Sequence, residues 1–157
     1  MPYSKSGSAP WATDANLFAA LEGGRKVTSW FGYLPDFHDA KVRCMEFSAG
    51  AGVVEIEAFR MTSEVDEKGY FILDRQALVT LNLSGVTGVT MSCDPNPGIE
   101  ELGIRRLNSE VDIPADIAAL VGDLEIAFDD VCGGSGTIFA RSISLTVTPA
   151  PTPVSES

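Results

Sequence analysis

The chain has 157 residues, of which 45% are hydrophobic and 21% charged; this composition is that of one ordinary globular domain and argues against a largely disordered protein. Its formal net charge of −11 disfavours binding to nucleic acid or to anionic membranes. Such a charge would speed the approach of a basic partner, but it is equally accounted for by solubility alone. No apolar run reaches the length of a membrane span and the N-terminus lacks the pattern of a secretion signal, so we expect a cytosolic, cytoplasmic protein.

The two ends differ in composition from the body of the chain. Residues 1–12 and 149–157 are rich in Pro, Ser, Ala and Thr and offer no period for packing, which predicts flexible ends. Residues 13–148 contain no internal repeat and no linker, which predicts a single β-rich domain.

Residues 13–24, TDANLFAALEGG, carry the start and stop signals of a short helix. Thr13 or Asp14 can cap the first free N–H groups, an apolar stripe follows, and Gly23 or Gly24 can end the helix in the left-handed conformation. We expect this helix to cover one face of a sheet.

The period changes to two along the rest of the chain. Strict alternation of apolar and polar residues is typical of strands with one buried and one exposed face, and it occurs in residues 53–59, 77–83, 123–128 and 142–147. Shorter candidate strands are residues 41–47, 89–93 and 101–107. Turn-forming segments separate them at residues 49–52, 63–69, 94–98 and 132–136.

Short strands joined by short turns predict a mainly β (α+β) fold, built as an antiparallel β-meander sheet with the short N-terminal helix. Pro114, followed by apolar residues, allows one further short helix near residues 114–121.

The sequence contains no set of residues that matches a known catalytic motif. The chain has one histidine, no phosphate-binding glycine loop and no nucleophile elbow, so we predict a non-catalytic protein with no cofactor and no metal site. The segment 94–101, DPNPGIEE, lacks the ligand spacing of a calcium loop. The three cysteines are odd in number and widely spaced, which predicts buried thiols rather than a disulfide or a zinc site. They are Cys44, Cys93 and Cys132.

Residues 30–42, WFGYLPDFHDAKV, hold the only histidine between two aspartates and among aromatic residues. If residues 36–42 run extended, Asp36 and His38 share one face as a hydrogen-bonded pair that favours the charged imidazole, and Asp39 points away to accept backbone N–H groups. The aromatic side chains would then bury large apolar areas and pin this corner to the sheet. We favour a structural corner over a functional site.

This motif, followed by the alternating strands, by TLNLSGVTGVTM and by a terminal ARSISLTV, resembles the bacterial immunity protein fifty family over roughly residues 28–147. The segment W/F-G-x-x-P-x-F-H-D-A carries the resemblance. Its positions here are Trp30, Phe31, Gly32, Pro35, Phe37, His38, Asp39 and Ala40. Members of that family are predicted antidotes of polymorphic toxins, so the resemblance implies a non-catalytic cytosolic protein that binds and neutralises a cognate bacterial toxin.

An inhibitor of a basic toxin would use an acidic surface, because opposite charge raises association rates. The acids in predicted turns are therefore our candidates for toxin contact: Glu64, Asp66, Glu67, Asp129 and Asp130. A competing interpretation is a β-rich module that binds a small molecule or a sugar in a pocket between the sheet and the N-terminal helix. An enzyme that uses only Asp and Glu is a third, weaker interpretation. The sequence predicts neither the oligomeric state nor the strand order.

Overall fold

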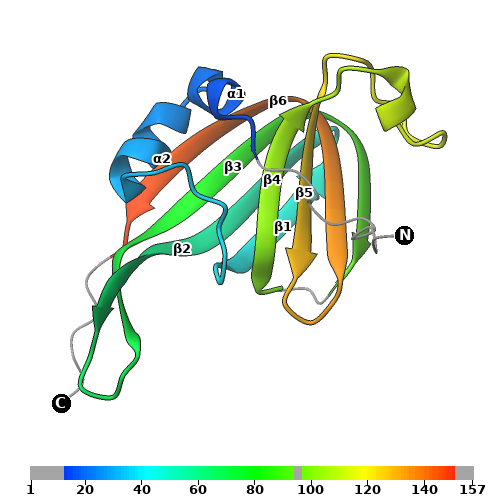
Figure 1. Ribbon diagram of the computed structural model, residues 1–157. Helices are drawn as coiled ribbons and strands as arrows, with labels where there is room; N and C mark the ends of the chain where they lie inside the picture. Colours follow the sequence, from blue (N-terminus) through cyan, green and yellow to red (C-terminus); the bar gives the residue numbers. More distant parts are fainter. Residues whose placement is uncertain (1–12, 94–96, 151–157) are drawn as a thin grey trace.

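The alternating segments form one six-stranded antiparallel sheet with two short helices (Figure 1). The computed structural model describes residues 13–93 and 97–150. The helices are α1 (Ala15–Ala20) and α2 (Gly24–Phe31). The strands are β1 (Lys41–Ser48), β2 (Ala51–Val65), β3 (Phe71–Ser92), β4 (Ile99–Arg106), β5 (Leu124–Asp130) and β6 (Ser135–Pro149). The predicted mainly β fold class is confirmed.

The predicted flexible ends fall almost wholly outside the described residues, as does most of the predicted turn at 94–98. β6 continues through Pro149, one residue past the predicted end of the body.

Two meanders lie side by side in the sheet. The strand order is β1-β2-β3-β6-β5-β4, and every neighbouring pair is antiparallel. A meander therefore describes each half, but β6 rather than β4 lies beside β3. The β3–β6 ladder runs from Ala77 opposite Pro149 to Ser92 opposite Ser135, a length that the eight residues of β4 could not match.

The segment that leads into the edge strand β1 pairs over a short stretch with β4, the other edge strand of this open sheet. Four backbone hydrogen bonds join residues 36–42 to residues 97–102; Ile99, for example, accepts from the Asp39 N–H (2.8 Å) and donates to the Ala40 carbonyl (2.7 Å). We call this contact the seam. Because an open strand edge leaves N–H and C=O groups free to pair with other chains, the seam satisfies groups that would otherwise be exposed at both edges.

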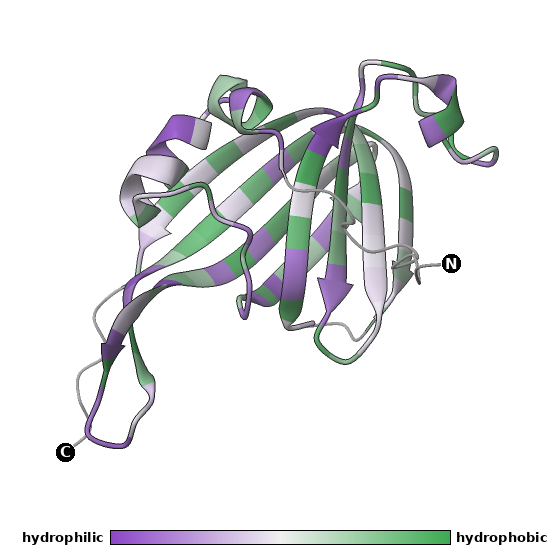
Figure 2. Cartoon of the chain, viewed as in Figure 1, coloured by the Kyte–Doolittle hydropathy of each residue, from purple (hydrophilic) through white to green (hydrophobic). Residues whose placement is uncertain are grey.

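The alternation of apolar and polar residues is visible along the strands (Figure 2), but its phase is not constant, and one change occurs on β6. Ala140 and Ile143 both belong to the core although they lie three residues apart on β6, a spacing that places side chains on opposite faces of a regular strand. The change occurs at Arg141, which lies opposite Gly85 of β3, a residue with φ of +64°. The two long strands thus change phase at the same level.

Both helices pack on the core. Asp14 caps α1, its carboxylate accepting the N–H groups of Asn16 and Leu17, as the sequence predicts. The buried side chains of the two helices join those of the sheet in one apolar cluster; they are Leu17, Phe18, Val27 and Phe31. No helix in the described part of the chain has the length and apolar character needed to cross a bilayer.

The sequence does not predict α2, because Gly23 and Gly24 read as the end of a single helix. α1 ends at Ala20 instead, with Leu21 as its C-cap, and Gly23 is the N-cap of α2 with φ of +82°. Gly23 also lies against β6, so that a Cβ atom at this position would be only 1.7 Å from the carbonyl oxygen of Leu145. Glycine therefore allows both the sharp turn between the helices and their close approach to the sheet.

The predicted helix near residues 114–121 is wrong. This segment consists of turns and irregular chain, and the helical piece between β4 and β5 is a 3-10 turn, Glu110–Asp112. The apolar side chains do not share a face: Ile117 packs against a small cluster that includes Phe139, whereas Leu120 and Val121 are exposed. Tertiary contact, rather than helical period, decides where these residues lie.

We predict that Gly23→Ala destabilises the fold more than Gly50→Ala. Both glycines have positive φ, of +82° and +79°, but a Cβ at Gly50 meets nothing within 4 Å. Left-handed backbone costs either variant about 1–2 kcal/mol, and the clash with Leu145 should cost Gly23→Ala roughly 1–3 kcal/mol more. Urea unfolding measures both, and equal losses would contradict the close approach of Gly23 to β6.

Candidate functional site

The motif forms a turn that leads into β1. Residues 36–39 are not extended, since Phe37 and Asp39 have φ of +61° and +64° and the Ala40 N–H donates to the Phe37 carbonyl (3.0 Å). The Asp36 carboxylate accepts the backbone N–H of the second residue along (3.0 Å), which stabilises the turn. The prediction that the chain runs extended from Asp36 is therefore wrong.

This turn reverses the predicted roles of the two aspartates. Nε2 of His38 lies 3.4 Å from a carboxylate oxygen of Asp39, although the sequence predicts that these side chains point apart. Asp36 bonds the backbone of His38 rather than its ring. Nδ1 of His38 lies 2.7 Å from the carbonyl oxygen of Glu100 on β4, so the histidine side chain also bridges the seam.

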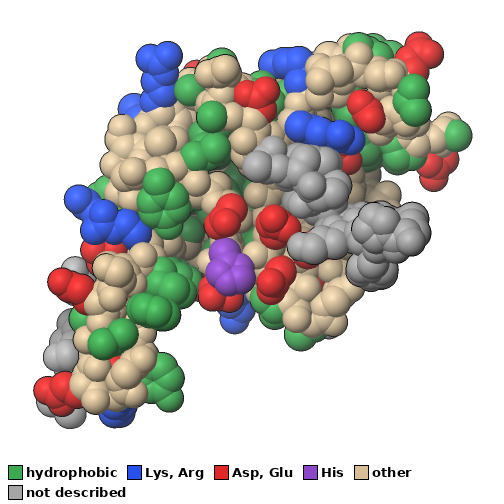
Figure 3. Space-filling view, in the orientation of Figure 1, with side chains coloured by type: hydrophobic (Ala, Val, Ile, Leu, Met, Phe, Trp, Pro, Cys, Tyr) green, Lys and Arg blue, Asp and Glu red, His purple; other side chains and the backbone are tan. Residues whose placement is uncertain are grey.

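The pKa of His38 is raised above its ordinary value. The main cause is the hydrogen bond from the ring to the backbone carbonyl of Glu100; partial burial opposes the shift, and the negative charges of Asp39, Glu100 and Asp36 add to it. Figure 3 shows the histidine among acidic side chains on one face of the molecule. We call His38 and the three acids around it, Asp36, Asp39 and Glu100, the acidic cluster.

The aromatic residues of the motif differ in burial. Phe31 and Phe37 are buried, as predicted, but Tyr33 is 44% exposed. Trp30 is half-buried; its Nε1–H donates to the Arg75 carbonyl (2.9 Å), and the Arg75 guanidinium lies 4.9 Å from its ring centroid. Trp30 thereby ties α2 to β3.

The remaining motif residues also have structural places. Gly32 ends α2 in the left-handed conformation, with φ of +81°, and Pro35 and Ala40 are buried. Together with the hydrogen bonds of the seam, these contacts give the motif a structural role at the corner where α2, β1 and β4 meet.

Beside this corner, β2 and β3 continue beyond the rest of the sheet as a two-stranded arm. Pairing of β1 with β2 ends at Glu57, and pairing of β6 with β3 ends at Ala77. Among the described residues, the strands of the arm, residues 59–75, form a ladder only with each other. Figure 1 shows the arm projecting away from the body. Within residues 13–93 and 97–150, each arm strand therefore has an open edge.

The arm carries six of the thirteen large apolar side chains that are exposed in the described part of the chain. They are Met61, Val65, Tyr70, Phe71, Ile72 and Leu73, between 39% and 69% exposed. These residues are missing from the candidate sites predicted from the sequence. The sequence does carry a signal for them, the run YFIL at residues 70–73. Consecutive apolar residues in a strand lie on both faces of the sheet, and they are all buried only if other elements cover the two faces.

The base of the arm is fixed by an ion pair across its two strands. Arg60 donates two hydrogen bonds to the Asp74 carboxylate, of 2.8 Å and 2.6 Å, in the bidentate arrangement that suits a guanidinium. This hydrogen bonding lowers the pKa of Asp74 and raises that of Arg60. Burial, followed by the charge of Asp36, raises the pKa of the nearby Tyr33 hydroxyl. The arm base and the acidic cluster thus share an electrostatic environment.

Three of the predicted contact acids lie together at the tip of the arm. Glu64 and Glu67 are exposed. Asp66 is also exposed, but its carboxylate accepts the N–H groups of Lys68 (2.8 Å) and Tyr70 (3.0 Å). Asp66 therefore shapes the turn, and Glu64 and Glu67 remain the acids free to contact a partner.

The other two predicted contact acids lie elsewhere, at the turn between β5 and β6. Asp129 is half-buried. Asp130 is only 5% exposed, and its carboxylate accepts the N–H of Cys132 (2.9 Å). Its contacts therefore belong to the turn, and it offers little surface to a partner.

The cysteines are free thiols, and their predicted burial is wrong for Cys132, which is exposed at this turn; Cys44 and Cys93 are half-buried. Across residues 13–93 and 97–150, no group of three or more His, Cys, Asp or Glu side chains could hold a metal ion.

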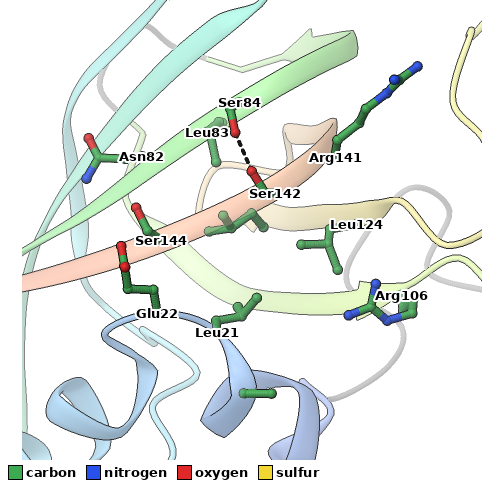
Figure 4. A pocket seen from close by; sticks show the side chains of 12 residues that line it. Leu21, Glu22, Asn82, Leu83, Ser84, Arg106, Leu124, Arg141, Ser142 and Ser144 are labelled. Atoms are coloured by element: carbon green, nitrogen blue, oxygen red, sulfur yellow. Dashed lines mark hydrogen bonds between the residues drawn. The ribbon is translucent and has the colours of Figure 1, made fainter.

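A cavity of about 610 Å³ lies between the end of α1 and strands β3 and β6 (Figure 4). This is the place where the competing interpretation predicts a ligand pocket. The lining combines serine, asparagine, glutamate and arginine side chains with apolar ones.

Comparisons with protein-family models, with curated proteins and with solved structures give no significant match to this chain. The resemblance to the immunity protein fifty family stays a prediction that rests on the motif.

We predict that His38→Ala destabilises the protein more at low pH than at high pH. Loss of the bond to the Glu100 carbonyl should cost about 0.5–1.5 kcal/mol. Because the pKa of His38 is raised in the folded state, the added stabilisation is fully present below the unfolded-state pKa of about 6.5 and is lost as the pH rises through the folded-state pKa. Urea unfolding on both sides of this window measures the difference. His38→Gln, which keeps a donor but does not titrate, is the control, and a pH-independent loss in His38→Ala would contradict the assignment.

Proposed function

We propose that this protein is a non-catalytic, cytosolic immunity protein that binds and neutralises a cognate bacterial toxin, and that the arm is its main contact surface. The observation that carries the proposal is the arm itself, a projecting hairpin that exposes six large apolar side chains. The motif that resembles the immunity protein fifty family supports the same conclusion.

The arm has the composition of an interface centre rather than of an ordinary surface. Exposed apolar patches on soluble proteins commonly mark sites of protein–protein contact, and aromatic residues such as Tyr70 and Phe71 are frequent among residues that dominate binding energy. The open edges of the arm strands also offer backbone N–H and C=O groups to a strand of a partner. Apolar side chains and free backbone groups thus occur together on one element.

Charge indicates the chemistry of the partner. Glu64 and Glu67 lie at the tip of the arm and the acidic cluster lies beside its base, on a chain with a net charge of −11. A basic toxin domain would approach this face faster than a neutral one. An inhibitor acts by covering its target, so it needs such a surface and no catalytic group.

A second candidate function is a module that binds a small molecule or a sugar. The cavity of about 610 Å³ beside α1 favours it, because ligand pockets commonly measure about 300–1,000 Å³. The two functions use different surfaces of the molecule, so each can be tested without the other.

The direct test is a rescue experiment. The C-terminal domain of the neighbouring large open reading frame is expressed from an inducible promoter, with and without this protein, and growth is measured. Restored growth together with co-purification is the expected result. No rescue by a protein shown to be folded and expressed would reject the immunity function.

We predict that Tyr70→Ser combined with Phe71→Ser abolishes rescue and weakens toxin binding. Loss of one buried aromatic contact commonly costs at least about 2 kcal/mol, or roughly 30-fold in affinity. Both side chains are more than half exposed, so the fold should be retained, which circular dichroism checks. Val111→Ser, which removes a side chain that is 91% exposed on the loop between β4 and β5, is the matched control. Full affinity in the arm variant would show that the toxin binds elsewhere.

We also predict that Glu64→Lys combined with Glu67→Lys slows association with the toxin and reduces its salt dependence. Reversal of two acids at a contact surface should lower the association rate constant by about tenfold or more at low salt. Asp66 is left unchanged because it holds the turn. Glu110→Lys combined with Asp116→Lys makes the same change in net charge on the β4–β5 loop. Equal slowing in both variants, measured by stopped flow, would mean that only the net charge matters.

A further inference from the structure

The cavity beside α1 exists because β6 is longer than its neighbour. β5 pairs with β6 only as far as Leu124 opposite Ala140, and beyond this point the same edge of β6 is taken by Glu22, whose carbonyl accepts the Leu145 N–H (2.7 Å). The edge between these two contacts is covered by neither β5 nor the link between the helices. The cavity opens over this gap, with Leu124 and Glu22 both in its lining.

Two arginines lie at one end of the cavity, and each is held by the fold. Arg106, at the end of β4, donates from Nη1 to the carbonyl of Gly122 (2.7 Å). The aliphatic stem of Arg141 lies over Gly85, where a Cβ atom would be 2.8 Å from Cβ and Cγ of the arginine. Because Arg106 pairs with Leu124 and Leu124 with Ala140, the α-carbons of Arg106 and Ala140 are two strand spacings, about 10 Å, apart.

Neither guanidinium is neutralised by a carboxylate among the described residues, whereas Arg60 and Arg105 each form an ion pair with an acid. Acidic residues outnumber basic ones by two to one in this chain, 22 to 11. Two arginines that have no acidic partner in the described part of the chain therefore form a local positive site at one cavity of an acidic protein. Planar guanidinium groups suit phosphate and carboxylate oxygens, which they can bind through paired hydrogen bonds.

The other end of the cavity offers hydrogen bonds to neutral groups. The register places Ser84 opposite Ser142 and Asn82 opposite Ser144, and the first two hydroxyls are bonded to each other. Figure 4 shows Arg106 and Arg141 on one side of the cavity and Asn82, Ser144 and Glu22 on the other. Glu22 forms an isolated backbone β-bridge with Ser144. Ser144 lies three residues along β6 from Arg141, a separation of about 10 Å. A carboxylate at this end accepts hydrogen bonds from hydroxyl groups and repels a second anion.

We propose that this cavity binds a small organic anion in which a phosphate or carboxylate group is attached to a hydroxylated carbon skeleton. Arg106 and Arg141 hold the anionic group. The serine hydroxyls, Asn82 and Glu22 bond the hydroxyl groups, and the partly buried Leu21 packs against the skeleton. This site is separate from the arm, so it holds whether or not the arm binds a toxin, and it assigns a chemical class to the small-molecule function.

The test is a titration of the isotope-labelled full chain, followed by backbone amide chemical shifts. The probes are glucose 6-phosphate and glucuronate, with glucose and inorganic phosphate as the separate halves of the first. We expect saturable shifts at residues 82–84 and 141–144 with at least one of the two sugar anions, and weaker binding of glucose and of phosphate. Shifts that do not saturate with either sugar anion, or that map to other residues, would overturn the proposal. Binding of inorganic phosphate as tight as that of glucose 6-phosphate would overturn the role of the hydroxyl groups.

Substitutions test the two arginines. Arg141→Gln should weaken binding about tenfold or more, since a hydrogen bond to a charged group contributes about 1.5–3 kcal/mol. Arg106→Gln, on another strand, gives an independent second variant if Arg141→Gln disturbs the spectrum of the free protein. Arg25→Gln removes the same charge from α2, outside the cavity lining, and should leave the affinity unchanged. Equal weakening in Arg25→Gln would show that net charge rather than the cavity attracts the ligand.

Discussion

Backbone hydrogen bonding across the seam is the constraint on which the rest of the structure depends. To reach it, the chain leaves α2, turns through two residues with positive φ, and presents its N–H and C=O groups to β4. Left-handed backbone at Phe37 and Asp39 costs of order 1 kcal/mol each, and the hydrogen bonds of the seam offset this. Burial of Phe37 and Ala40 fixes the same turn from the inside. A conspicuous histidine motif can therefore serve mainly to join two strands.

Both surfaces proposed to bind partners arise where a strand extends beyond the end of its neighbour. The arm begins where β1 and β6 stop pairing with β2 and β3, and the cavity opens where β5 stops pairing with β6. In each place the long strand presents side chains or backbone groups that a neighbour would otherwise cover. Unequal strand lengths thus separate a body with a packed core from the parts that remain available for contact.

The sequence predicts the local features of this fold better than the tertiary ones. Alternation locates the strands, and Asp14 reveals the first helix, because both signals lie within a few residues. α2 is missed because Gly23 has the signature of a helix end, while its actual role depends on the distant carbonyl of Leu145. The helix expected after Pro114 fails because Ile117 packs against a strand. The placement of Arg106 and Arg141 at the same cavity depends on strand order and register, which a single sequence does not reveal.

The arm is built from one hairpin, with its tip far from the core, and its ladder shifts register between Met61 and Val65. Side chains on a strand repeat every two residues, so insertion or deletion of two residues in each arm strand would preserve the pattern of faces and the turn while leaving the body unchanged. Loss of a single residue from one strand would instead exchange its faces. The reach of this protein could therefore change in steps of about 7 Å without redesign of its core, which would let a common body evolve against targets of different shape.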